Sequence, residues 1–293
     1  MAVYSIRELE KLSGIKAHTL RMWEKRYDLI EPRRTTTNIR YYTDGDLKRI
    51  LSVAMLNRHG IKISHIARLN ELELKEEILR LNQVSTTFGN LIDSLVMAMI
   101  DFDEYKLNAL IESAIARAGF HQVTVQVLFP FLAKVGILWQ SGEVNPAQEH
   151  FVSGIIRQKV ISQIDRLPVK YEPGAKRFLL ILPEGEWHEL SLLFTHFMLK
   201  EAGQHVIYLG QSVPYADVLA TGASLNFDAL VVASTTSQSE FNFGTYLKEL
   251  GVAFPDKLIL YFSRSLQGDI EGLGDQHHQI PCDRDFSEFI LSL

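Results

Sequence analysis

The sequence predicts three regions of different fold class: an all-α winged helix-turn-helix head, a four-helix bundle, and a doubly wound parallel α/β sheet. Three observations support this division. The 293 residues exceed one ordinary domain. Helical periodicity runs through the middle region, and short apolar runs alternate with helical segments in the last region. We place the domains at residues 1–74, 75–170 and 171–293.

The head is predicted from its helix signals. Ser5 and Glu8 form a capping box for a helix that Gly14 ends, and a second helix spans about Lys16 to Tyr27. The gap of three or four residues between these helices is typical of a helix-turn-helix.

A short hairpin, or wing, is predicted to follow Pro32. Asn38 separates the segments 34–37 and 39–42 and tolerates the left-handed conformation of a tight turn. Further helices are expected over Asp44–His59 and from Ser64.

The middle region has four helical segments, with Pro146 suited to the first position of the last one. Short links between them favour an up-and-down bundle. The segments are 84–100, 103–118, 120–140 and 146–166.

A polar linker, Pro168–Lys176, precedes the α/β region. Its alternation predicts a sheet of about five strands, with a ligand crevice at their carboxyl ends. The expected strands are Arg177–Leu182, His205–Leu209, Ala229–Ser234 and Lys257–Phe262, and the helices are 189–202, 215–225 and 238–250.

Composition narrows the class of protein. No uninterrupted apolar run reaches the length of a membrane span, and no secretory signal is evident. The single cysteine, Cys282, excludes an internal disulfide framework. We therefore expect a cytoplasmic protein without membrane association.

Charge is divided unevenly along the chain. Residues 1–70 hold 14 Lys or Arg and 7 Asp or Glu, whereas the remainder holds 16 and 28, so a basic head precedes an acidic body. This asymmetry indicates that the basic head binds a polyanion.

Cationic and hydroxyl side chains on the second helix and the wing are suited to duplex DNA, because Arg binds guanine edges and phosphates in a bidentate manner. The alternative is that Arg21, Arg26 and Arg40 pair with local acids such as Glu24 and Asp28. The candidate DNA-binding residues are Lys16, His18, Thr19, Arg21, Arg26, Tyr27, Arg34, Arg40 and Tyr41.

This stretch resembles the MerR family of winged-helix regulators over about 70 residues. The matching segments are Tyr4–Leu9, Ser13–Ile15, Thr19–Glu24, Arg26–Tyr27, Leu29–Ile30 and Arg34–Tyr42, with Asn38 where the family usually has Gly. The resemblance implies binding of double-stranded DNA at an inverted-repeat operator by a homo-oligomer, a dimer or a tetramer.

Two clusters stand out in the body. Trp139 precedes the pair Glu149-His150 by nine intervening residues, and Glu186-Trp187-His188 follows the first strand of the α/β region. A His at the carboxyl edge of a parallel sheet can ligate a metal, and a nearby carboxylate can orient it. The alternatives are a core Trp beside a helix-end His salt bridge, and an ordinary loop histidine.

Together the clusters resemble the cobalamin-binding module, a helical cap joined to a flavodoxin-like (Rossmann-like) domain. With the head, the domain order is similar to that of light-responsive cobalamin-dependent repressors of carotenoid genes. The resemblance implies cobalamin, with adenosylcobalamin suspected, His188 as the cobalt ligand, and a photoreceptor function. The implied cofactor-binding residues are Trp139, Glu149, His150, Glu186, His188, Ser191 and Ser234.

This sequence departs from the module at several glycine and loop positions. Ser191 stands at the glycine of the lower motif, Ser234-Thr235-Thr236 replaces Ser-x-Leu, and Phe262-Ser263 replaces Gly-Gly. Phe262 and Ser263 are expected to crowd the pocket for the nucleotide tail. The alternative is a DNA-binding regulator whose degenerate module senses another ligand or a protein partner.

An enzyme is not expected. The sequence lacks the nucleophile elbow, the P-loop, the dinucleotide glycine motif and His-Glu-x-x-His. His277 and His278 are interpreted as surface histidines, because adjacent strand residues point to opposite faces.

Overall fold

The computed structural model describes residues 3–34, 38, 40–58, 60–74, 76–77, 88–140, 144–168, 173–235, 242–263, 270 and 272–280. It divides into two compact units, residues 1–156 and 157–293. The boundaries of the three predicted domains at 74/75 and 170/171 remain a prediction from the sequence.

The head begins with two helices that the sequence predicted closely. Helix α1 (Ile6–Ser13) starts at Ser5, where the predicted capping box forms between Ser5 and Glu8. Gly14 ends α1 in the left-handed conformation, with φ of +73°. Helix α2 (Ala17–Tyr27) follows, so the helix-turn-helix is confirmed.

The wing is a small antiparallel sheet in the order β1-β3-β2. Strands β2 (Arg33–Arg34) and β3 (Arg40–Thr43) form the predicted hairpin, and Asn38 has the expected positive φ of +64°. Strand β1 (Val3–Tyr4) was not predicted from the sequence. Helices α3 (Asp44–Arg58) and α4 (Ile63–Ile66) complete the head.

The four predicted helical segments of the middle region are present. They are α6 (Phe88–Ile100), α7 (Glu104–Ala118), the continuous stretch formed by α8 (Phe120–Val123), the π-helical η1 (Thr124–Leu128) and α9 (Phe129–Gln140), and α10 (Pro146–Arg166). Pro146 occupies the first position of α10, as predicted.

The π-helical turn was not predicted, and Pro130 explains it. Proline lacks an N–H and its ring crowds the carbonyl four residues earlier, so a regular α-helix is disfavoured there. The Phe129 N–H instead donates to the Thr124 carbonyl, five residues back. The wider turn lets the helix continue past the proline.

The stretch Phe120–Trp139 is long and apolar enough, by length and composition, to cross a membrane. It is one 20-residue helical segment that includes polar residues such as His121, Gln122 and Gln126, so it contains no uninterrupted apolar run of that length. A core helix passes the same test, and Val127, Phe131 and Val135 are fully buried. Its one cation, Lys134, binds the buried Asp93 at 2.9 Å.

Polar contacts join the head to the helix that follows it within the first unit. Arg58 of α3 binds Asp93 of α6, and Lys48 of α3 binds Asp101 near the end of α6. Asp93 is 3 % exposed and also accepts the bond from Lys134. This buried carboxylate therefore connects α3, α6 and α9.

The second unit contains a parallel sheet in the order β5-β4-β6-β7-β8. Numbered from the first strand of this sheet, the order is 2-1-3-4-5, which is typical of flavodoxin-like doubly wound folds and reverses between β4 and β6. The strands are β4 (Arg177–Pro183), β5 (His205–Val213), β6 (Ala229–Ser234), β7 (Leu258–Ser263) and β8 (His277–Gln279).

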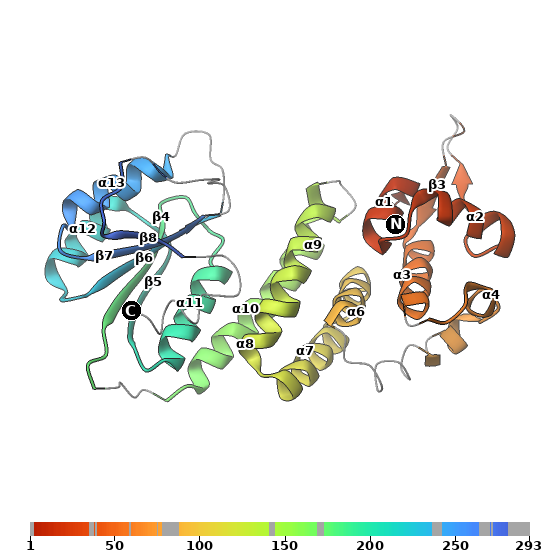
Figure 1. The fold of residues 1–293 in the computed structure, drawn as a ribbon, viewed down its shortest axis with the longest axis horizontal. Coiled ribbons are helices and arrows are strands. Elements are labelled where there is room, and N and C mark those ends of the chain that lie inside the picture. The colour runs from red at the N-terminus through yellow and green to blue at the C-terminus, as the bar shows by residue number, and fades with distance from the viewer. Residues whose placement is uncertain are drawn as a thin grey trace. The chain divides into compact units, whose positions relative to one another are not determined.

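Helices cover both faces of the sheet (Figure 1). Leu180 and Leu182 of β4 pack with α11 on one face, whereas Leu179 and Ile181 pack with α12 and α13 on the other. The helices are α11 (Leu190–Glu201), α12 (Tyr215–Ser224) and α13 (Phe243–Ala253).

Two details of this region differ from the prediction. Helix α13 begins at Phe243, later than expected, because Asn242 caps it by accepting the Thr245 N–H at 3.0 Å. His277 is a partly buried residue and not a simple surface histidine, since its Nε2 lies 2.9 Å from the Leu247 carbonyl of α13. His278 is exposed, as expected.

Some predicted features lie outside the described residues. They are Thr236, Cys282, the wing positions 35–37 and 39, His59, residues 84–87, 141–143, 238–241 and the linker positions 169–172.

Candidate functional site

The loop between β4 and α11 begins with a tight turn. The Glu186 N–H donates to the Pro183 carbonyl at 3.0 Å, and Gly185 has φ of +81°, a conformation that favours glycine. The Gly185 N–H donates to Ser212 Oγ at 3.1 Å, and the Ser212 N–H donates to the Glu186 carbonyl at 3.1 Å. The carboxyl end of β5 therefore holds the start of this loop.

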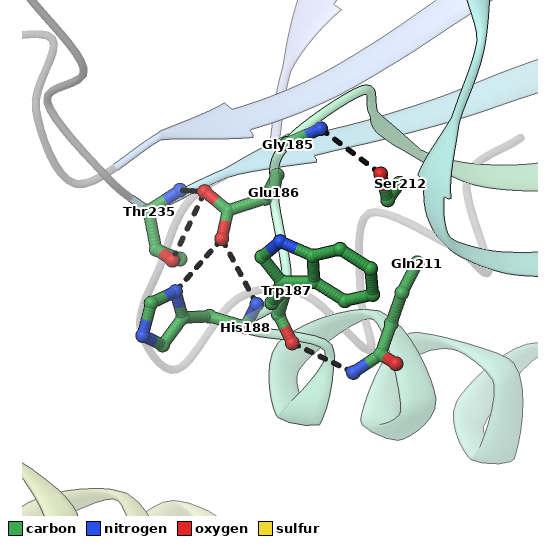
Figure 2. A network of polar contacts seen from close by, with 7 residues as sticks. All are labelled: Gly185, Glu186, Trp187, His188, Gln211, Ser212 and Thr235. Carbon is green, nitrogen blue, oxygen red and sulfur yellow. Dashed lines mark hydrogen bonds and ion pairs between the residues drawn. The ribbon is translucent and has the colours of Figure 1, made fainter.

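Glu186 organises the loop through both carboxylate oxygens (Figure 2). Oε1 accepts the His188 backbone N–H at 2.9 Å and lies 2.8 Å from His188 Nδ1. Oε2 accepts the Thr235 backbone N–H at 2.8 Å and the Thr235 hydroxyl at 3.4 Å. Glu186 is 3 % exposed, so these bonds satisfy a carboxylate that is removed from water.

This arrangement selects one form of the His188 ring. An ionised carboxylate only accepts hydrogen bonds, so the proton of the neutral ring is assigned to Nδ1. Nε2 then carries the lone pair that can bind a metal, as in carboxylate–histidine–metal triads. The His188 side chain is largely exposed, whereas Glu186 is buried.

The serine positions noted in the sequence are buried to different degrees. Ser234 ends β6 and is buried, and Ser263 ends β7 and is also buried. Ser191 lies in the first turn of α11, and its Oγ is buried without a hydrogen-bond partner among the described residues. Phe262 is buried in the core on the α11 face of the sheet.

A second buried carboxylate, Glu189, follows His188 directly. Glu189 Oε1 binds Arg157 Nε of α10, and Oε2 accepts the Tyr208 hydroxyl of β5 at 2.6 Å. Burial and this bond to Glu189 raise the pKa of Tyr208. The Tyr208 ring stacks on His196, with 5.4 Å between centroids. Burial, together with the charge of Lys200, lowers the pKa of His196 to about 4.

The other predicted cluster lies where α9 ends and α10 begins. The Val144 N–H donates to the Leu138 carbonyl at 3.2 Å, which ties this connection to the end of α9. Asn145 and Gln148 form a reciprocal capping box for α10, with bonds of 3.0 and 3.1 Å. These contacts position the next two residues of the helix, Glu149 and His150.

Glu149 and His150 are brought together: His150 Nδ1 lies 2.9 Å from Glu149 Oε2. Trp139 stands one residue before the end of α9 and is 52 % exposed, so it is not a core Trp. The cluster thus presents an indole, a carboxylate and an imidazole on exposed or half-exposed side chains.

The structure places most candidate DNA-binding residues on the surface. His18, Arg21 and Arg26 are exposed on α2, and Thr19 and Tyr27 are partly exposed. The Arg26 guanidinium lies over the Tyr27 ring, 5.4 Å from its centroid.

The proposed pairing of arginines with local acids is found for Arg40, whose Nε lies 3.7 Å from Glu24 Oε1. Glu24 also accepts the Tyr42 hydroxyl at 3.2 Å, and burial and Glu24 raise the pKa of Tyr42 to about 12. On the wing, Arg34 binds the Asn38 side chain at 2.7 Å, and Tyr41 lies opposite Arg33. Lys16 is exposed and binds Glu10 at 3.0 Å.

Sequence reasoning missed several residues of these sites. Thr235, Gln211 and Ser212 were not assigned, although the rule that sites gather at the carboxyl ends of strands could have identified Thr235. No sequence signal marks the contact of Arg157 with Glu189, which are 32 residues apart.

Comparison with known families adds two matches. Residues 4–72 match the model of the MerR HTH family regulatory protein. Residues 91–161, which run from within α6 to within α10, match the model of the B12 binding domain.

Two curated relatives span most of the chain. It is 29 % identical to the HTH-type transcriptional repressor CarH of Myxococcus xanthus, over 96 % of this chain and 92 % of the relative. It is 25 % identical to the HTH-type transcriptional repressor CarA of the same organism, over 83 % of this chain and 81 % of the relative. Both relatives are named as regulators and not as enzymes.

A solved structure shares the fold of a large part of the chain. The chain matches the monomethylamine corrinoid protein of Methanosarcina barkeri with a TM-score of 0.55 and 15 % identity, covering 70 % of this chain and 99 % of that one.

These findings place a head similar to MerR HTH regulators before a body similar to B12 binding domains. More particularly, the chain combines a MerR-type helix-turn-helix with a B12 binding domain and a five-stranded parallel sheet of Rossmann-like form.

Proposed function

We propose that this chain is a transcriptional repressor whose binding to DNA is controlled by a corrinoid ligated through His188. The observation that carries the proposal is the Glu186–His188 pair at the point where the strand order reverses, in a chain that also has a MerR-type head. Doubly wound sheets bind their ligands at this point.

The donor set fits a metal that brings most of its own ligands. Among the described residues, no group of three or more His, Cys, Asp or Glu side chains could hold a metal ion. A bare transition metal usually needs three or four protein ligands, whereas a metal inside a macrocycle needs one axial ligand. The buried Ser191 Oγ, which lacks a described partner, is a further polar group that a bound cofactor can satisfy.

Each residue has a role in holding this cofactor. His188 would hold the cofactor's metal through its ring nitrogen, Glu186 would fix the His188 ring and raise its basicity, and Thr235 would fix Glu186. Trp139, Glu149 and His150 would also contact the cofactor. Adenosylcobalamin, when bound, supplies a cobalt–carbon bond that is sensitive to light. We propose that the body consists of a four-helix-bundle cap joined to a flavodoxin-like domain.

The head would bind an inverted-repeat operator as part of a dimer or tetramer. The exposed Arg21 and Arg26 on α2 and Arg34 on the wing would contact phosphates and base edges. Two half-sites bound together gain affinity through effective concentration, so a ligand that favours one assembly state controls operator binding. We place the protein in the cytoplasm.

The test of this proposal is uptake of a corrinoid. Purified chain mixed with adenosylcobalamin in the dark should co-elute with a visible absorbance band, and His188→Ala should lower this uptake. Illumination should change both the size and the DNA affinity of the loaded protein. Absence of any corrinoid uptake by the wild-type chain would contradict the proposal.

A second candidate function is a DNA-binding regulator that senses another ligand or a protein partner. The buried Phe262 favours it, because this large side chain fills core space at the carboxyl end of β7 where the module usually has glycine. This alternative predicts salt-dependent DNA binding and no corrinoid uptake in the same experiment.

A further inference from the structure

Helix α2 of the head has a buried face, a face towards the wing and an exposed face. Leu20 and Trp23 are buried in the core of the head. Glu24 is turned towards the wing, where its carboxylate lies near Arg40 and accepts the Tyr42 hydroxyl. The exposed residues of α2 therefore share the remaining face. They are His18, Arg21, Met22, Lys25 and Arg26.

Met22 is the one apolar residue among these five, and its side chain is 50 % exposed. His18 and Arg26 lie four residues before and after Met22, and Lys25 lies three residues after it, so all three are its neighbours on the helix surface. A single exposed apolar side chain is ordinary on a protein surface. Here it is surrounded by basic residues, so a polyanion bound by these residues also covers Met22.

Duplex DNA offers different partners to the basic residues and to Met22. Arg and Lys bind phosphate oxygens, and these contacts orient the helix without reading the sequence. A thioether carries no charge and has no hydrogen-bond donor, so it does not bind phosphate. In the major groove, the apolar group of the base edges is the C5-methyl group of thymine. The unbranched, flexible side chain of Met adapts well to such an irregular apolar surface.

We propose that Met22 is a specificity-determining residue that packs against the C5-methyl group of a thymine in each half-site of the operator. Helix-turn-helix proteins read base edges from the N-terminal part of the second helix, and Met22 ends the first six of the eleven residues of α2. The inference rests on the proposed function and deepens it, because it names a base that the head reads. Arg21 contributes affinity through its charge, whereas Met22 contributes a preference between bases.

The experiment removes only the methyl group. Duplexes selected from a random pool by the full wild-type chain, in the dark with adenosylcobalamin, are compared with duplexes in which each dT of the half-site is replaced in turn by dU. We expect one such exchange to weaken binding by the wild type about three- to fourfold in fluorescence anisotropy. Met22→Ala should bind the parent duplex about as weakly as the wild type binds this dU duplex, and should not distinguish the two duplexes. Met22→Leu should keep the distinction.

The salt dependence gives a second readout. Met22 carries no charge, so Met22→Ala should leave the slope of log affinity against log salt unchanged. The matched control is Val252→Ala, which shortens an exposed apolar side chain of the second unit. It should keep the wild-type affinity and the full difference between dT and dU.

The outcomes separate this inference from the proposed function. The inference is overturned, and the proposed function stands, if the wild type binds its selected duplex but no exchange of dT for dU weakens binding. The same holds if the selected half-sites contain no thymine, or if Met22→Ala distinguishes dT from dU as the wild type does. If the wild-type chain binds no duplex, with or without adenosylcobalamin, the proposed function is wrong and the inference falls with it.

Discussion

Glu186 and Thr235 are joined across the reversal of the strand order, with Glu186 Oε2 accepting the Thr235 N–H at 2.8 Å. Glu186 follows β4 and Thr235 follows β6, and these two strands are neighbours in the sheet. The other oxygen of the same carboxylate holds His188. The position of the proposed metal ligand is therefore fixed by the carboxyl ends of both strands.

Replacing Glu186 tests this network directly. Glu186→Gln exchanges one accepting oxygen for an NH₂ group, which would face the N–H donors of either His188 or Thr235. We expect corrinoid affinity to fall about 10- to 100-fold in a spectral titration, as for other residues that orient metal-bound histidines. Glu184→Gln, an exposed change in the same loop, is the control. Equal corrinoid affinity of the two variants would show that the Glu186 carboxylate does not orient His188 for metal binding.

The Arg157–Glu189 ion pair should stabilise the second unit, because Glu189 is buried and Arg157 is half exposed. Among the described residues, Arg157→Ala leaves the buried carboxylate with the Tyr208 hydroxyl as its one side-chain partner, and we expect a loss of about 2 kcal/mol in urea unfolding. The double variant Arg157→Met/Glu189→Met should recover most of this loss. Arg166→Ala, at an exposed position of the same helix, should change stability little. If Arg157→Ala lowered the free energy of unfolding no more than Arg166→Ala does, the ion pair would not stabilise the second unit.

His196 should make stability depend on pH. Its folded-state pKa of about 4 lies below the ordinary value of 6.5, so the unfolded chain binds more protons between these values. Stability should fall as the pH drops from 6.5 towards 4, and we expect about 1–2 kcal/mol from this group after solvent screening. In His196→Phe this part of the pH dependence should vanish while the stacking on Tyr208 is kept. An identical slope in both proteins would exclude His196 as its source.

Arg21 should contribute to DNA affinity through charge. It is exposed on α2, and we expect Arg21→Ala to weaken duplex binding about tenfold or more and to reduce the slope of log affinity against log salt by about 1. Fluorescence anisotropy at several salt concentrations measures both. Arg117→Ala, which removes an exposed cation from α7, is the matched control. Its effect should be negligible, and the corrinoid uptake of both variants should equal that of the wild type.

Short-range patterns in the sequence predicted most of the helix ends, turns and strands. The Ser5–Glu8 capping box, the left-handed Asn38 and the N-terminal Pro146 are each fixed by residues within a few positions of one another. The apolar run Ala229–Ser234 was predicted with the same bounds as β6. Strand β8 was not predicted from the sequence, because His277–Gln279 has no apolar pattern. This strand forms only through its pairing with β7.

The network around the site could be predicted only in part. The pairing of Glu186 with His188 is local, so the sequence could indicate it. The bonds to Thr235 and from Arg157 to Glu189 join residues 49 and 32 positions apart. They depend on the order of strands and on the packing of α10, which no local pattern encodes.

The most direct test of the central claim measures DNA affinity with and without the ligand in one protein. Duplexes selected from a random pool by the wild-type chain would be titrated in the dark, with and without adenosylcobalamin, against wild type and His188→Ala. We predict that the ligand tightens binding by the wild type at least about tenfold and leaves His188→Ala unchanged. Wild-type protein that takes up the corrinoid but binds the duplex with the same affinity in both conditions would contradict the account.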